Sequence, residues 1–353
     1  MVILHIAYID NGVLGGVQTA VPKMVEAQSQ YASVALLNLH GSDVPSVKNV
    51  TLGDVFPNSL EKPFDEPDLV VFHELYRVPF IRLYRELKRR KIPYVIVPHG
   101  CLSKQAQKQK ALKKFVGNTL FFHAFLRSAN MIQYLSDNEK AMSKFSLPSY
   151  VAGNGVDIPK VRSQGSQEDG SHFVYIGRLD IEIKGLDLLL EAIANSQEWL
   201  RAQNVRVSLY GPNTDDSHAV LNSICQEKNI SDLVSISGTV LGEEKRTILL
   251  GADYFIQTSR SEGMPMGVLE ALSYGIPCVV TQGTGMAQII EEWDAGMSCP
   301  TSSEGIGQAI RQTVESFDLR NVQSIHAAEL AAEKFDRNKI AKETLEILKN
   351  QIQ

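Results

Sequence analysis

The sequence predicts an α/β protein that contains two doubly wound parallel sheets. Short apolar segments of four to seven residues, rich in β-branched side chains, alternate with amphipathic segments of ten or more residues. This alternation is typical of parallel sheets whose two faces are both covered by helices. The chain has 353 residues, about twice the size of a typical single domain, so two domains are expected.

The predicted elements follow this alternation along the whole chain. In the first half the expected strands are Val2–Tyr8, Ser33–Leu39, Asp68–Phe72, Tyr94–Val97, Met131–Tyr134 and Ser149–Ala152, with helices such as Val17–Gln30 and Val78–Lys91 between them. In the second half the expected strands are His172–Ile176, Val205–Tyr210, Leu233–Ser237, Tyr254–Gln257 and Pro277–Thr281. The helices expected there are Gly185–Asn195, Asp216–Lys228, Glu243–Leu250 and Gly267–Tyr274, followed by a helical tail from Ser303.

The segment Ile158–Ser171 is polar, contains Gly and Ser, and has no periodicity, so it predicts a linker. We therefore expect an N-terminal domain over 1–157, a C-terminal domain over 172–335, and a final helix over 336–353 that packs back on the first domain. Two Rossmann-like lobes with a cleft between them are the predicted architecture. Ligands of such sheets bind at the carboxyl ends of the strands.

The formal charge of −5 conceals an asymmetry between the two halves. Residues 1–150 carry 18 basic and 12 acidic side chains, whereas residues 151–353 carry 17 and 28. Within the first half, residues 71–150 alone hold 15 basic and 4 acidic side chains. This excess predicts that the first domain faces an anionic partner: a phosphorylated substrate, a membrane surface or a nucleic acid.

The composition of the chain disfavours several classes of protein. The four cysteines lack the CxxC spacing, so a zinc site or disulfide framework is not expected, and a reducing cytoplasm is the predicted compartment. The first residues predict a strand, not a signal peptide, and no charge-free apolar run is long enough to span a bilayer. Any membrane association is therefore expected to be peripheral, on the inner face of the cytoplasmic membrane.

The most informative motif is SRSEGMPMGVLEA, between a predicted strand and a predicted helix. Gly263 and Gly267 permit a tight turn whose free N–H groups can hold an anion or a hydroxyl. Glu262 in the loop and Glu270 two turns later can accept hydrogen bonds from sugar or ribose hydroxyls. The alternative is that Glu262 only complements the helix dipole and Glu270 is a solvated helix residue.

A second motif, IGRLDIEIKG, places Arg178 after a strand and Lys184 at the start of a helix. Two cations at the carboxyl end of a strand suit a diphosphate, because Arg binds oxygens bidentately and Lys acts as a point charge. The alternative is that both are surface residues paired with Asp180 and Glu182.

Weaker signals lie in the first half. Gly15 and Gly16 form a glycine-rich turn after the first strand, without the spacing of a dinucleotide fingerprint or the Lys of a phosphate-binding loop. His73 and His99 each follow an apolar strand, where a lone histidine is more often structural than catalytic.

The segment Ser103–Arg127 is basic and then aromatic. Its lysines are Lys104, Lys108, Lys110, Lys113 and Lys114. They predict either a solvated basic helix or an interfacial segment on the acceptor or membrane side, since each lysine near an anionic surface contributes roughly 1 kcal/mol. Nucleic acid is not expected as a partner, because no recognition motif is present and the second half is acidic.

Together these motifs resemble the GT-B-fold retaining glycosyltransferases of family 4, also called glycosyl transferases group 1. The second half carries IGRLD and KGLDLLLEA, then SGTV, then EGMPMGVLEALSYGIPCVV and GTG in the family's order. The first half matches more loosely, through LGGVQ, PHG and NGVD. One departure is EGMP in place of the common EGFG, because Pro265 removes a backbone N–H from the sugar-binding loop.

The resemblance implies a role for each matching residue. Arg178 and Lys184 resemble the pair that neutralises the donor diphosphate, and Glu262 resembles the contact to the donor sugar. His99 is similar to the family's histidine near the reaction centre. The other implied donor-binding residues are Gly15, Gly16, Thr239, Val240, Gly263, Met264, Pro265, Met266, Gly267, Val268 and Glu270.

The resemblance further implies a retaining transfer from a nucleoside diphosphate sugar, with UDP-sugar favoured over GDP-sugar. The expected acceptor is a saccharide on an undecaprenyl-type lipid, in surface polysaccharide biosynthesis. The chain has no D-x-D triplet, so we expect catalysis without a metal or cofactor, with the two cations supplying the charge. The alternatives are a nucleotide-sugar epimerase of the same fold and a non-catalytic protein that binds nucleotide sugar.

Overall fold

The computed structural model describes residues 1–10, 16–102, 121–143, 145–166, 169–214 and 216–350. The chain divides into two compact units, one formed by Met1–Gly155 with Arg337–Gln353 and the other by Val156–Asp336. The division thus falls just before the predicted linker. The predicted linker thus belongs with the second unit, where the Ser163 hydroxyl donates to the carbonyl oxygens of Leu250 and Ala252 at 2.9 and 3.0 Å.

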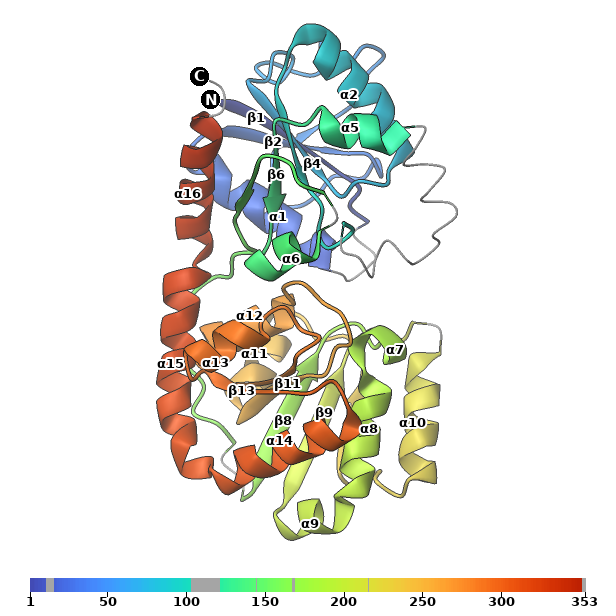
Figure 1. Cartoon of the computed structure of the whole chain (residues 1–353), viewed down its shortest axis with the longest axis vertical. Helices are drawn as coiled ribbons and strands as arrows, with labels where there is room; N and C mark the ends of the chain where they lie inside the picture. Colours follow the sequence, from blue (N-terminus) through green and yellow to red (C-terminus); the bar gives the residue numbers. More distant parts are fainter. Residues whose placement is uncertain (11–15, 103–120, 144, 167–168, 215, 351–353) are drawn as a thin grey trace. The chain divides into compact units, whose positions relative to one another are not determined.

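The first unit contains a parallel sheet in the order β3-β2-β1-β4-β5-β6-β7 (Figure 1). Its strands are β1 (Val2–Ala7), β2 (Ser33–Asn38), β3 (Asn49–Val50), β4 (Leu69–His73), β5 (Tyr94–Val97), β6 (Met131–Tyr134) and β7 (Ser149–Val151). Its helices are α1 (Gly16–Ser29), α2 (Val78–Arg90), α5 (His123–Arg127), α6 (Asp137–Met142) and α16 (Arg337–Lys349).

Alternate side chains of these strands face opposite sides of the sheet, as the period of two requires. On one side, Leu4 and Ile6 of β1 join an apolar core with the buried side chains of α2 and α5. His5 lies between these two residues in β1, so its side chain points to the opposite face of the sheet. There it hydrogen-bonds to Gln28 of α1, the helix that covers that face. The last helix, α16, packs against α1 although the two helices belong to opposite ends of the sequence (Figure 1).

The second unit contains a parallel sheet in the order β10-β9-β8-β11-β12-β13. Its strands are β8 (Ser171–Ile176), β9 (Val205–Tyr210), β10 (Val234–Ser237), β11 (Tyr254–Gln257), β12 (Cys278–Thr281) and β13 (Gly296–Cys299). Its helices are α7 (Ile181–Lys184), α8 (Leu186–Asn195), α9 (Gln197–Ala202), α10 (Ser217–Glu227), α11 (Gly242–Leu250), α12 (Met266–Ser273), α13 (Ala287–Glu292), α14 (Ser303–Glu315) and α15 (Arg320–Lys334), with a 3-10 turn at Phe317–Leu319.

Each face of this second sheet has its own core. Helices α8 and α14 contact each other over one face, where Phe173 and Tyr254 stack with ring centroids 5.0 Å apart. Helices α12 and α15 contact each other over the other face, where Val174 and Phe255 are buried. The predicted α/β class with two doubly wound parallel sheets is therefore confirmed.

The strand predictions agree with the structure to within one residue at each end, and two strands were missed. Strand β3 has only two residues, and β13 has the sequence GMSC, which lacks the β-branched side chains used to recognise strands. Among the described residues, no helix is long and apolar enough to cross a membrane. All four cysteines are free thiols.

Asp253 connects three segments of the second unit from a site that is almost fully buried. Its Oδ1 accepts hydrogen bonds from the backbone N–H of Ser166 at 2.9 Å and from Arg320 of α15 at 2.6 Å. Its Oδ2 accepts the backbone N–H of His172 in β8 at 2.9 Å. This one carboxylate therefore holds the segment entering β8 against the start of α15.

We expect Asp253→Ala to lower the free energy of unfolding by about 3–5 kcal/mol, because it leaves a largely buried guanidinium and two backbone donors without their acceptor. The matched control is Glu243→Ala, which removes the exposed ion pair with Arg246 and should change stability by less than about 0.5 kcal/mol. Chemical denaturation of both variants measures the difference. Equal stabilities for the two would contradict this role of Asp253.

Candidate active site

The two strongest sequence motifs meet at one edge of the second unit's sheet. Strands β8 and β11 pair in parallel, so their carboxyl ends are neighbours. The segment after β8 carries Arg178 and, as the last residue of the short helix α7, Lys184; the loop after β11 carries Glu262. The structure joins the two loops directly, because Lys184 Nζ forms an ion pair with Glu262 Oε1.

The loop that carries Lys184 is held by local hydrogen bonds. Asp180 caps the short helix α7 by accepting the N–H of Ile183 at 2.9 Å. Gly185 ends this helix with φ +62°, and a Cβ there would lie 2.2 Å from the Thr258 carbonyl oxygen. Only glycine allows this close approach. The Thr258 hydroxyl also donates to the Lys184 carbonyl at 2.9 Å, which anchors the loop to the end of β11.

The Lys184–Glu262 pair is largely removed from solvent, with 11% and 22% of the two side chains exposed. The second carboxylate oxygen of Glu262 accepts from the Ser259 hydroxyl at 2.9 Å and the Gln257 amide at 3.2 Å. Ser259 and Gln257 are themselves buried. Lys184 therefore pairs with Glu262 and not with Glu182, the partner that the surface interpretation assigned to it.

Arg178 differs from Lys184 in its exposure. Its side chain is 46% exposed, and its ion-pair contact is with Asp180 Oδ2 at 3.9 Å, beyond hydrogen-bonding distance. Its backbone is held in place, since the Tyr175 hydroxyl donates to the Arg178 carbonyl at 2.8 Å. The guanidinium can therefore turn toward an anionic ligand without first breaking a strong internal pair.

Helix α12 begins against the end of β8. A Cβ at Gly267 would lie 2.7 Å from the Ile176 carbonyl oxygen, so glycine allows the helix to start there. Pro265 occupies the N-cap and provides no side-chain hydrogen bond, and Gly263 lies in open space. Met264 and Met266 pack against the core, and Val268 is buried. The first-turn amides of α12 thus lie beside the strand end from which the Arg178 loop starts.

Glu270, on α12, is paired with a cation that sequence reasoning missed. Lys245 of α11 forms an ion pair with Glu270 Oε2, and each side chain is about one quarter exposed. The two residues lie on different helices and share no local motif, so only the packing of α11 near α12 reveals the pair. Thr239 and Val240 precede α11, and the structure leaves Thr239 exposed and buries Val240.

The predicted residues of the first unit are described only in part. Gly15, Lys104, Lys108, Lys110, Lys113 and Lys114 lie outside the described residues. Gly16 is the first residue of α1. His99 follows β5 in a left-handed conformation with φ +50°, and Gly100 continues it with φ +84°.

His99 is the end of a chain of three hydrogen-bonded imidazoles. His99 Nε2 lies 3.0 Å from His73 Nδ1, His73 Nε2 lies 2.9 Å from His5 Nδ1, and His5 Nε2 lies 2.9 Å from Gln28 Oε1. His5, His73 and Gln28 are buried, whereas His99 is partly exposed. The sequence indicated His73 and His99 as two separate candidates, and no local motif predicted that they form a hydrogen-bonded chain with His5.

Burial keeps these imidazoles neutral. Desolvation lowers the pKa of His5 and of His99 to about 4, and it lowers the pKa of His73 well below its ordinary value, with further lowering by the two neighbouring rings.

Glu139 fixes the turn after β5, because its carboxylate accepts the N–H of Gly100 at 2.5 Å and that of Leu135 at 2.6 Å.

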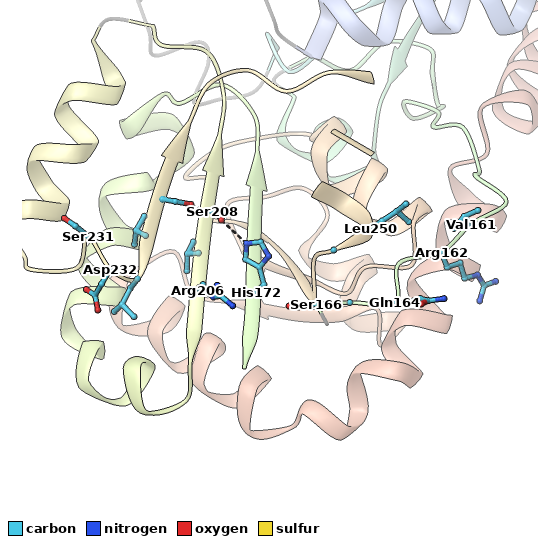
Figure 2. A pocket seen from close by; sticks show the side chains of 16 residues that line it. Val161, Arg162, Gln164, Ser166, His172, Arg206, Ser208, Ser231, Asp232 and Leu250 are labelled. Carbon is cyan, nitrogen blue, oxygen red and sulfur yellow. Dashed lines mark hydrogen bonds between the residues drawn. The ribbon is translucent and has the colours of Figure 1, made fainter. Parts of the chain in front are cut away.

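A cavity of about 780 Å³ lies elsewhere in the second unit, beside the amino ends of β8, β9 and β10 (Figure 2). Figure 2 shows His172 pointing toward Ser208 there, at 2.8 Å between Nε2 and Oγ. None of the candidate site residues lines this cavity. It is therefore distinct from the edge that carries Arg178, Lys184 and Glu262.

Comparison with known families identifies the second unit. Residues 156–329 match the family described as "Glycosyl transferases group 1". The second unit is a glycosyl transferases group 1 domain. Arg178, Lys184, Glu262 and Glu270 all lie within the matched residues.

Two bacterial proteins illustrate what the chain is similar to in sequence. The chain is 27% identical over 189 residues to a GDP-mannose:cellobiosyl-diphosphopolyprenol alpha-mannosyltransferase of Xanthomonas campestris, covering 52% of this chain and 48% of that protein. It is 29% identical over 240 residues to the putative teichuronic acid biosynthesis glycosyltransferase TuaC of Bacillus subtilis, covering 62% and 54%. Each match therefore spans about half of the relative's length.

A solved structure covers the whole chain. The Anabaena protein Alr3699/HepE, crystallised in complex with UDP and glucose, matches with a TM-score of 0.75 and 17% identity over 99% of both chains. The group 1 domain and the first unit together thus have the GT-B fold, with two Rossmann-like domains.

The Lys184–Glu262 pair should show a strong energetic coupling. In a double-mutant cycle of Lys184→Met and Glu262→Gln we expect about 1–3 kcal/mol of coupling in the free energy of unfolding, because each single variant leaves the other polar group without its partner. The exposed Lys48–Glu61 pair, with 54% and 50% of the two side chains exposed, is the control and should give less than about 0.5 kcal/mol. Equal coupling in the two cycles would argue against a special role for the buried pair.

The histidine chain should make the first unit sensitive to acid. The unfolded chain takes up protons on histidine near pH 6.5, whereas folded His5 does so near pH 4, so the unfolded state binds more protons between these values. Stability should fall as the pH drops through this window, by about 2 kcal/mol from His5 between pH 7 and pH 5. Hydrogen exchange of β1 and β4, corrected for intrinsic rates, measures this loss. His5→Gln, which cannot titrate, should show a shallower pH slope; an unchanged slope would refute the assignment.

Proposed function

We propose that this chain is a glycosyltransferase that moves a sugar from a nucleoside diphosphate sugar to a saccharide acceptor. The observation that carries the proposal is the meeting of Arg178, Lys184 and Glu262 at the carboxyl edge of a parallel sheet. Ligands of doubly wound sheets bind at this edge. The group 1 family match over the same residues supports the assignment.

The donor diphosphate is proposed to bind Arg178, Lys184 and the first-turn amides of α12. Arg178 has its guanidinium exposed, and Lys184 Nζ carries three donors of which Glu262 Oε1 accepts one. Glu262 is then positioned to accept a hydrogen bond from a hydroxyl of the sugar. Glu270 is proposed to take the ribose hydroxyls, and the turn at Thr239 and Val240 to contact the base.

The proposed reaction breaks the bond between the sugar C1 and the oxygen of the β-phosphate. A bond forms between C1 and an acceptor hydroxyl oxygen on the same face, and the hydroxyl proton passes to the departing diphosphate. Charge builds up on that diphosphate as C1 departs, and preorganised cations at this position lower the barrier. Arg178 and Lys184 are proposed to supply this charge without a metal ion, since the chain lacks a D-x-D triplet.

The donor is proposed to be a UDP-sugar in preference to a GDP-sugar. The structural neighbour Alr3699/HepE was solved with UDP and glucose, while the Xanthomonas campestris relative is named for GDP-mannose. The binding experiment below therefore includes both UDP-sugars and GDP-sugars.

The acceptor is proposed to be a lipid-linked saccharide used in surface polysaccharide biosynthesis. The names of the two relatives, which refer to a diphosphopolyprenol and to teichuronic acid, support this. Helix α2 adds a physical argument, because Arg82, Arg85, Lys88 and Arg89 are all exposed on it. Of these four, Arg89 is paired with Glu86. A basic helix face of this kind suits an anionic membrane surface.

Nucleotide sugars should bind and turn over in an Arg178-dependent manner. In a thermal-shift panel of UDP- and GDP-sugars we expect one compound to raise the melting temperature, because a ligand of the native state stabilises it. Arg178→Ala should then lower kcat at least about a hundredfold, since one charged donor to the leaving group is worth about 3 kcal/mol.

Arg311→Ala is the matched control, because Arg311 is also about half exposed but lies on α14 against Trp199. It should keep full turnover. Near-wild-type transfer by Arg178→Ala, or a panel without any stabilising nucleotide sugar, would refute the proposed function. Incubation with the nucleotide sugar alone separates the epimerase alternative, which would change the sugar without an acceptor.

Membrane association should depend on α2. In co-sedimentation with vesicles containing anionic lipid, Arg82→Glu with Arg85→Glu should weaken binding at least about tenfold, because each basic residue near the surface contributes about 1 kcal/mol. Charge reversal at Arg246 and Arg311 of the second unit alters the net charge equally and should have little effect. If both double variants bind like the wild type, α2 does not contact the membrane.

A further inference from the structure

The cavity of about 780 Å³ in the second unit lies on a sheet face that is unusually polar (Figure 2). Strands of a doubly wound sheet are normally apolar on both faces, because helices cover both. Strands β9 and β10 instead have the alternating sequences VRVSLY and VSIS. Their valine, leucine and isoleucine side chains belong to the core on one face, so Arg206, Ser208 and Ser235 point to the other.

The apolar core on that other face does not extend to these two strands. In the described part of the chain, its fully buried strand residues come from β8, β11 and β12, and none comes from β9 or β10. The cavity occupies the place where such a core would continue, beside the amino ends of the strands. The polar face is therefore a property of the sequence, and the cavity is not an accidental packing defect.

A row of hydrogen-bonded side chains crosses the three strands in this cavity. Ser235 Oγ lies 2.9 Å from Ser208 Oγ, which lies 2.8 Å from His172 Nε2. The row follows the strand register, since Ser235 is opposite Ser208 and Arg206 is opposite His172. Desolvation lowers the pKa of His172, so the imidazole is neutral at pH 7. Neutral imidazole and hydroxyl groups both donate and accept hydrogen bonds.

A second wall of the cavity, formed by the segment 161–166, is held in a fixed conformation. Gly165 has φ +79°, and a Cβ there would lie 2.5 Å from Asp253 Oδ1, so only glycine fits. The Gly165 N–H donates to the Ser163 hydroxyl at 3.0 Å, and the Ser166 N–H donates to Asp253 at 2.9 Å. Because this wall is already ordered, a ligand binds without paying for its folding.

The described lining of the cavity carries a net positive charge. Arg162 and Arg206 line it and are exposed. Asp232 is the acidic residue of the described lining, and both of its oxygens already accept from Arg201, at 2.7 and 3.0 Å. The rest of this half is acidic, since residues 151–353 hold 28 acidic and 17 basic side chains. A positive cavity in an acidic unit favours an anionic ligand.

We propose that this cavity is a second ligand site, which binds an anionic sugar. Arg206 and Arg162 bind its charged group, because a guanidinium pairs bidentately with phosphate and carboxylate alike. Ser235 and His172 bind its hydroxyls, because both can donate and accept. The volume of about 780 Å³ lies within the range of small-molecule sites, roughly 300–1,000 Å³.

This site is separate from the edge that carries the candidate active site. His172 lies at the amino end of β8, whereas Arg178 follows its carboxyl end. The six residues of β8 span about 20 Å. A small ligand in the cavity therefore does not contact Arg178, and every residue of the site belongs to the second unit. The inference consequently does not depend on the proposed function.

The test is isothermal titration calorimetry of the full chain with glucose 6-phosphate, glucuronate, glucose and inorganic phosphate. The three sugars differ only at C6, so they separate phosphate, carboxylate and neutral hydroxyl. We expect glucose 6-phosphate or glucuronate to bind at least about tenfold more tightly than both glucose and phosphate, since only an anionic sugar engages the arginines and the hydroxyls together. If neither anionic sugar exceeds both controls, the proposal is wrong.

Variants of the lining locate the binding. Arg162→Gln with Arg206→Gln should weaken binding of the anionic sugar at least about tenfold, because two charged donors are lost. Arg246→Gln with Arg311→Gln removes the same charge elsewhere in the second unit and should change affinity by less than about twofold. Equal affinities of the two double variants would overturn the proposal.

Two single variants complete the set. Ser235→Ala should weaken binding about threefold, and it keeps the proposal testable if the double arginine variant does not fold, because Ser235 is exposed. Arg178→Ala should bind the anionic sugar like the wild type. Loss of binding in Arg178→Ala would place the sugar at the other edge of the sheet and contradict the proposal.

Histidine NMR gives a readout that is independent of these variants. During titration with the anionic sugar, the ring resonances of His172, assigned with His172→Gln, should shift, whereas those of His5 and His73 in the first unit should not. Binding that leaves the His172 resonances unchanged would show that the sugar occupies another place.

Discussion

The ion pair between Lys184 and Glu262 is the constraint on which the candidate site depends. A lysine with only 11% of its side chain exposed requires a charged partner, and the partner comes from a different loop. To bring them together, Gly185 must pass within contact of Thr258, and Ser259 and Gln257 must hold the other oxygen of Glu262. The remaining cation, Arg178, is left exposed. One buried pair thus organises the edge of the sheet, and one exposed arginine is left to respond to a ligand.

The sequence was sufficient for the fold class and for most strands, because buried parallel strands are continuous apolar runs that stand out from their surroundings. It failed for β3 and β13, where the run is too short or too rich in small residues. For the site, Arg178, Lys184, Glu262 and Glu270 could be proposed from local motifs. Their actual partners could not, because Lys245 and Glu270 belong to different helices, and Lys184 and Glu262 follow different strands.

In the first unit, too, local sequence motifs could not predict which side chains contact one another. His5, His73 and His99 come from three different segments, and a lone histidine after a strand has no distinguishing local pattern. Only the register of β1 beside β4 and of β4 beside β5 brings the rings into line. The charge asymmetry, by contrast, was visible in the sequence, and four of its described basic residues, Arg82, Arg85, Lys88 and Arg89, lie on the exposed face of α2.

The packing of α16 on α1 has a consequence for biosynthesis. The first unit is discontinuous, since it is completed by residues 337–349 only after the whole second unit has been translated. During synthesis the buried side chains of α16, such as Leu345 and Leu348, reach α1 last. The second unit is continuous in sequence and can therefore reach its native state first, although domains generally fold from the N-terminus onward. The nascent first unit therefore keeps an apolar face of α1 uncovered until α16 has been translated, and transiently exposed apolar surface of this kind promotes aggregation.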